Sequence, residues 1–63
     1  MKRAELVRRI NEIARARGET AVWTEGSRHT KVRVGDATSV VPRHREVNEY
    51  TARAIFKDLE GEQ

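Results

Sequence analysis

The segment Gly26-Ser27-Arg28-His29-Thr30-Lys31-Val32-Arg33-Val34 combines a turn with an alternating strand. Gly26 and Ser27 are typical turn residues, and the pattern after them predicts a hairpin turn that leads into a strand including His29. Successive strand side chains point to opposite faces, which predicts one face with His29, Lys31 and Arg33 and another with Thr30, Val32 and Val34. The first face could serve a function or could simply be the solvated side of the strand.

Two further strands are predicted beside this one. Ala21–Glu25 precedes the turn with strand-like alternation and carries Trp23, which we interpret as part of the core. Gly35-Asp36 forms a second turn signal, and Ala37–Val41 follows it as a strand that Pro42 ends. Three successive strands joined by short turns predict an antiparallel meander.

A helix is predicted at each end of the chain. The first extends from Lys2 to about Arg17, with an apolar stripe formed by Leu6, Val7, Ile10, Ile13 and Ala14. Gly18 is placed to end it. The second helix follows Asn48, a good N-cap preceded by the apolar Val47, and its stripe consists of Ala52, Ile55, Phe56 and Leu59. The final residues, Glu60 to Gln63, are predicted to be frayed.

These elements predict a single α+β domain over residues 1–63, in the order α-β-β-β-α. A three-stranded sheet this short needs one covered face, and two amphipathic helices are available to cover it. We therefore expect Val32, Val34 and Trp23 to point toward the helices. The opposite face, with His29 and the two cations, is expected to be open to solvent.

Composition limits the possible functions. The chain of 63 residues has no cysteine, which excludes disulfides and thiolate metal sites, and its two histidines lack metal-ligand spacing. Residues 1–45 carry 11 Lys and Arg against 5 acids, net +6, whereas residues 46–63 carry 2 against 5, net −3. A basic body rich in arginine is typical of proteins that bind nucleic acid or an acidic partner. Without a long apolar run or a signal-peptide core, a cytoplasmic location away from membranes is expected.

Three segments form a combined motif: Gly26-Ser27-Arg28-His29, Lys31-Val32-Arg33-Val34 and Ser39-Val40-Val41-Pro42-Arg43-His44. In these segments the sequence resembles the HicA toxins of bacterial and archaeal toxin-antitoxin pairs. The order of elements, the opening Lys2–Leu6 and the closing Arg53-Ala54-Ile55 also match. One departure is the stretch between the first helix and Gly26, which is longer than usual.

The resemblance implies a double-stranded-RNA-binding-domain-like fold and metal-independent cleavage of mRNA, with no cofactor. His29 takes the position of the family's catalytic histidine. The implied partner is a HicB-type antitoxin that covers the toxin and this histidine, and the acidic second helix could hold that partner or a second copy of the chain.

RNA carries its own nucleophile, the 2′-hydroxyl, so such an enzyme needs acid–base groups and positive charge but no metal. His29 is the predicted general acid or base, because imidazole titrates near neutral pH. The candidate phosphate contacts are Arg28, Lys31, Arg33, Arg43 and His44. His44 is also a candidate second proton-transfer group, or a brace for the loop after Pro42. Two alternatives remain: an RNA-binding module without catalysis, and a basic interaction protein for an acidic partner.

Overall fold

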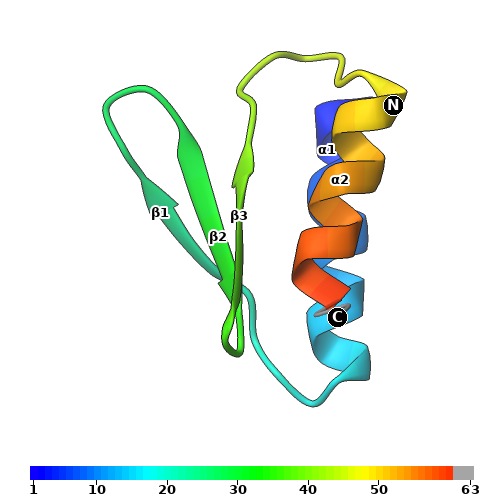
Figure 1. Ribbon diagram of the computed structural model, residues 1–63, viewed down its shortest axis with the longest axis vertical. Coiled ribbons are helices and arrows are strands. Elements are labelled where there is room, and N and C mark those ends of the chain that lie inside the picture. The colour runs from blue at the N-terminus through cyan, green and yellow to red at the C-terminus, as the bar shows by residue number, and fades with distance from the viewer. Residues whose placement is uncertain (61–63) are drawn as a thin grey trace.

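The computed structural model describes residues 1–60 and contains two helices and a three-stranded antiparallel sheet. The elements in chain order are α1 (Arg3–Ala16), β1 (Val22–Glu25), β2 (Thr30–Val34), β3 (Ala37–Val41) and α2 (Glu49–Glu60). The predicted α+β order is confirmed, and both helices lie on the same side of the sheet (Figure 1). The part of the predicted frayed tail beyond Glu60 lies outside the described residues.

The sheet is a meander in the order β1-β2-β3, with β2 at its centre. The turn between β2 and β3 consists of Gly35 and Asp36, since Val34 pairs with Ala37. Gly35 has a φ of +61°, which suits the first central position of a type II′ turn and is unfavourable for other residues. The tight second turn predicted from the sequence is thereby confirmed.

The end of α1 and the start of α2 follow from local chemistry. Gly18 has a φ of +71° directly after the last turn of α1, and the Glu19 amide donates a 2.8 Å hydrogen bond to the Ala14 carbonyl. At the start of α2 the Asn48 Oδ1 accepts a 2.7 Å hydrogen bond from the Tyr50 amide. These contacts satisfy backbone groups that the helices leave unpaired at their ends.

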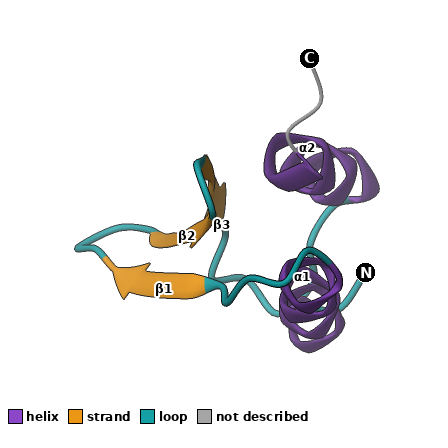
Figure 2. Ribbon diagram, turned by 90° about the horizontal axis from the view of Figure 1, so that it is seen from below, coloured by secondary structure: helices purple, strands orange, loops and turns teal. Residues whose placement is uncertain are grey.

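Figure 2 looks along the two helices and shows them beside the sheet, and the core residues come from the sheet and both helices. Its buried residues come from every element except β1: Leu6, Ile10, Ala14, Val32, Val34, Val41, Val47, Ala52, Ile55 and Leu59. Trp23 of β1 packs against this core while partly exposed, and its Nε1 donates a 3.2 Å hydrogen bond to Asn11 Oδ1. The predicted apolar stripes of both helices therefore face inward.

The N-terminus is hydrogen-bonded to the segment that precedes α2. The Val47 amide donates a 2.7 Å hydrogen bond to the Met1 carbonyl, and the Met1 ammonium donates to the Val47 carbonyl at 3.1 Å. Lys2 and Glu46 form an isolated antiparallel bridge next to these bonds. This arrangement places the start of α1 beside the loop after β3, where Arg3 reaches the candidate site.

The prediction that His29 lies on the central strand is wrong. Thr30, Val32 and Val34 are buried and Lys31 and Arg33 exposed, as the alternation predicted. The strand pairing, however, ends at Glu25 with Thr30, so His29 lies in a four-residue loop, 26–29, and not on the strand. The 2.8 Å hydrogen bond from the Gly26 amide to the His29 carbonyl closes this loop. Strand alternation therefore does not determine the direction of the His29 side chain.

Candidate functional site

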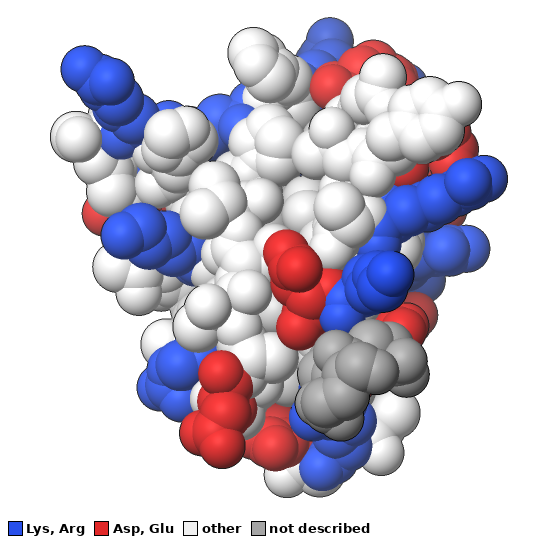
Figure 3. All heavy atoms as spheres, viewed as in Figure 1, with Lys and Arg blue, Asp and Glu red and all other residues white. Residues whose placement is uncertain are grey.

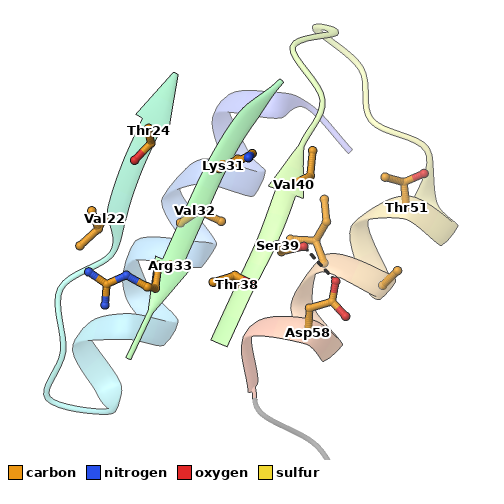
Figure 4. A pocket seen from close by; sticks show the side chains of 12 residues that line it. Val22, Thr24, Lys31, Val32, Arg33, Thr38, Ser39, Val40, Thr51 and Asp58 are labelled. Atoms are coloured by element: carbon orange, nitrogen blue, oxygen red, sulfur yellow. Dashed lines mark hydrogen bonds between the residues drawn. The ribbon is translucent and has the colours of Figure 1, made fainter. Parts of the chain in front are cut away.

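The open face of the sheet carries cations among small and apolar side chains. The register places Val22 opposite Arg33 and Thr24 opposite Lys31, and on the other side Lys31 pairs with Val40 and Arg33 with Thr38. These six residues line a shallow hollow that continues to Thr51, Ala54 and Asp58 of α2 (Figure 4). At its edge Ser39 Oγ donates a 3.0 Å hydrogen bond to Asp58 Oδ2.

Seen in the orientation of Figure 1, the positively charged side chains lie in two separate regions of the surface. Figure 3 shows Lys and Arg side chains over the strands on one side and over α2 on the other, with a band of uncharged atoms between them. Acidic side chains interrupt this band near the centre of the view and at its lower end. Lys31 and Arg33, the two outward cations of β2, are labelled beside the hollow in Figure 4.

The loop between β1 and β2 presents His29 and Arg28 to solvent. Within the described residues the His29 imidazole forms no hydrogen bond, so both ring nitrogens are free for a ligand. The loop projects from the hairpin end away from the helices (Figure 1), and His29 does not line the hollow of Figure 4. His29 thus lies directly before β2, outside the hollow but two residues along the chain from Lys31.

The remaining predicted phosphate contacts differ in how free they are. Lys31 is exposed and makes no ion pair within residues 1–60. The Arg33 Nη1 donates a 3.0 Å hydrogen bond to the Gly35 carbonyl, and the rest of its guanidinium faces solvent. His44 is exposed on the loop after Pro42.

Arg43 differs from the other candidates because its guanidinium is directed at the His29 loop. Its Nη2 donates to the Gly26 carbonyl at 2.5 Å, to the His29 carbonyl at 3.1 Å and to Glu25 Oε1 at 2.8 Å. Its Nε donates to Thr30 Oγ1 at 3.3 Å. The structure therefore brings the loop after β3 against the loop that carries His29.

Behind Arg43 lies a polar cluster that the sequence did not indicate. The buried Thr30 hydroxyl donates to Glu25 Oε1 at 2.9 Å and accepts from Arg3 Nη2 at 3.2 Å. Arg3 Nε also donates to the Pro42 carbonyl at 2.8 Å. The available signal was Thr30 itself, a hydroxyl at an inward strand position where alternation predicts an apolar residue.

This cluster lowers the pKa of the Glu25 carboxyl below the usual glutamate value. The hydrogen bond from the Thr30 hydroxyl contributes most, and the hydrogen bond and charge of Arg43 and the charge of Arg3 act in the same direction. Desolvation of the carboxyl by its neighbours opposes them, although the residue is exposed. The ionised form of Glu25 is thus favoured in the folded protein.

Because the Glu25 pKa is lower in the folded than in the unfolded chain, the ionised carboxylate stabilises the fold above the unfolded pKa, and this stabilisation is lost as pH falls through the folded pKa. Glu25→Gln is therefore expected to lower the free energy of unfolding at pH 7. The difference from wild type should shrink below about pH 4, near the ordinary glutamate pKa. Urea unfolding of both proteins between neutral pH and pH 3 measures it, and a constant difference throughout would contradict the expectation.

Two classes of feature are not found in the described part of the chain. Among residues 1–60, no three His, Asp or Glu side chains gather as a metal site requires. Neither helix, over that same range, has the length and apolar character needed to cross a membrane.

Comparisons with known proteins do not assign the chain to a family. No protein-family model matches the sequence, and no curated protein or solved structure is significantly similar to it. The functional interpretation therefore rests on the residues and their arrangement.

Proposed function

We propose that this protein is a metal-independent endoribonuclease of the HicA toxin type, with His29 as its general acid or base. The observation that carries the proposal is an exposed imidazole without a protein partner among residues 1–60, on a loop next to a strand with two outward cations. Nucleic acid is the partner class that suits an arginine-rich surface best. The resemblance in the glycine-serine-arginine-histidine segment and in Pro42-Arg43-His44 supports the same function.

In the proposed reaction the 2′-oxygen of the RNA attacks the adjacent phosphorus, and the bond from phosphorus to the 5′-oxygen of the next nucleotide breaks. His29 accepts the 2′-hydroxyl proton or protonates the departing 5′-oxygen, and water serves the other proton transfer. Lys31 and Arg33 offset the charge that develops on the phosphate. The products are a 2′,3′-cyclic phosphate and a 5′-hydroxyl. Arg28 and His44 are proposed as contacts to neighbouring phosphates, since both side chains are exposed.

The proposal includes three finer expectations. The arrangement of three strands and two helices is assigned to the double-stranded-RNA-binding-domain-like class, and a toxin that acts on mRNA is placed in the cytoplasm. A HicB-type antitoxin is proposed to cover the His29 loop and the open face. Inhibition of cleavage by such a partner, with loss of solvent access at His29, is the expected result in the complex.

The decisive experiment incubates the purified protein with a 5′-labelled RNA in EDTA. We expect cleavage that persists without divalent metal and yields cyclic-phosphate ends, while a DNA strand of the same sequence stays intact because it lacks the 2′-hydroxyl. Binding of RNA without any cleavage would instead favour the non-catalytic module. RNA affinity that disappears at physiological salt would favour a protein partner.

A further inference from the structure

The Arg43 side chain donates hydrogen bonds to both ends of the loop that carries His29. One Nη2 atom reaches the carbonyls of Gly26 and His29, which are the first and last residues of the loop. Outside the strand ladder, the loop has a single backbone hydrogen bond of its own within the described residues, from the Gly26 amide to the His29 carbonyl. The shape of this exposed loop therefore depends on a side chain 14 residues further along the chain.

The position of Arg43 is itself fixed by its surroundings. Glu25 Oε1 accepts from Arg43 Nη2 at 2.8 Å, and Thr30 Oγ1 accepts from Arg43 Nε at 3.3 Å. Thr30 is 1% exposed, so its hydroxyl offers a fixed acceptor on the sheet. Arg3 donates to that hydroxyl and to the Pro42 carbonyl next to Arg43, which connects the start of α1 to the same cluster.

We propose that Arg43 is a positioning residue for His29, holding loop 26–29 in the geometry that the imidazole needs for proton transfer. The catalytic consequence of this inference rests on the proposed function. The contact between Arg43 and loop 26–29 does not. It differs from the phosphate-contact role predicted from the sequence, because the Nε and Nη2 donors of Arg43 are engaged within the protein. A guanidinium suits this task because its planar donors reach several acceptors at once.

The catalytic test separates positioning from phosphate binding. Arg43→Ala is expected to lower the single-turnover cleavage rate at saturating RNA by about 10- to 100-fold, since a displacement of about 1 Å can cost that much. The dissociation constant for RNA and its salt dependence should stay close to wild type. If Arg43 contacted a phosphate, Arg43→Ala would instead weaken RNA binding and reduce the slope of log affinity against log salt concentration by about one. That result, together with an unchanged cleavage rate at saturating RNA, would overturn the proposal.

Arg43→Lys separates the charge of Arg43 from its fork geometry. Lysine keeps the positive charge, but its single ammonium does not reproduce the Nε and Nη2 contacts together. We expect this variant to remain slow, and full recovery of the rate would contradict the positioning role. Arg53→Ala is the matched control, because Arg53 is an exposed arginine of α2 without a side-chain hydrogen bond to any other described residue, and it should cleave at the wild-type rate.

Amide hydrogen exchange tests the loop without requiring any RNA cleavage. In Arg43→Ala and Arg43→Lys the Gly26 amide should exchange at least about tenfold faster than in wild type, while the core amides of Val32 and Val34 keep their rates. Unchanged exchange at Gly26 would overturn the proposal even in an active enzyme. Faster exchange at Gly26 in a protein that cuts no RNA would uphold the loop contact and reject the ribonuclease function, so the two failures are distinguishable.

Discussion

His29→Ala is expected to lower the rate of RNA cleavage by about 10²- to 10⁴-fold, the usual contribution of one positioned acid–base group. The imidazole is exposed and makes no hydrogen bond within residues 1–60, so its removal should leave the fold and its stability unchanged. RNA affinity should change little, because the phosphate contacts proposed here belong to other side chains. Initial cleavage rates in EDTA, with circular dichroism of both proteins, provide the measurement.

His44→Ala is the matched control for this substitution. Both histidines are exposed and lie in loops next to the sheet, yet only His29 lies in the loop that Arg43 holds. Because His44 is proposed to contact only the RNA backbone, we expect His44→Ala to weaken RNA binding but to retain most of the cleavage rate at saturating RNA. A loss as large as that of His29→Ala would identify His44 as the second proton-transfer group. Cleavage undiminished in His29→Ala would refute the proposed mechanism.

The sequence predicted the fold well because each element carries its own local signal. Alternation in Thr30–Val34 determined which side of β2 is buried, and Gly35-Asp36 determined the turn to β3. Gly18 and Asn48 marked a helix end and a helix start that the structure confirms. These signals involve neighbours in the chain, so they are visible without tertiary information.

The arrangement around His29 was less predictable because it depends on contacts between distant segments. Whether pairing ends at His29 or at Thr30 depends on how the loop closes, and alternation alone does not determine that. Arg43 was predicted to contact phosphate and Arg3 was not singled out, yet their contacts with Thr30 span 13 and 27 residues. A charged side chain in a sequence does not indicate whether solvent, a phosphate or the protein itself binds it.

Ile10→Ala is expected to destabilise the protein by about 2–5 kcal/mol, because it leaves a cavity in a small hydrophobic core. The Ile10 side chain is fully buried and belongs to the cluster in which α1 packs against the sheet and α2. A domain of 63 residues typically has only about 3–9 kcal/mol of stability. The variant should therefore be partly or largely unfolded at 37 °C, and urea unfolding followed by circular dichroism measures the change.

A graded series and an exposed control make this prediction specific to burial. Ile10→Val removes one methyl group from the same site and should cost about 0.5–1.5 kcal/mol. Val40→Ala deletes apolar atoms from the open face, where the residue is 45% exposed, and should change stability by less than about 0.5 kcal/mol. Equal losses for Ile10→Ala and Val40→Ala would mean that the open face is as tightly packed as the core. In that case the surface proposed to receive RNA would not be free in the isolated protein.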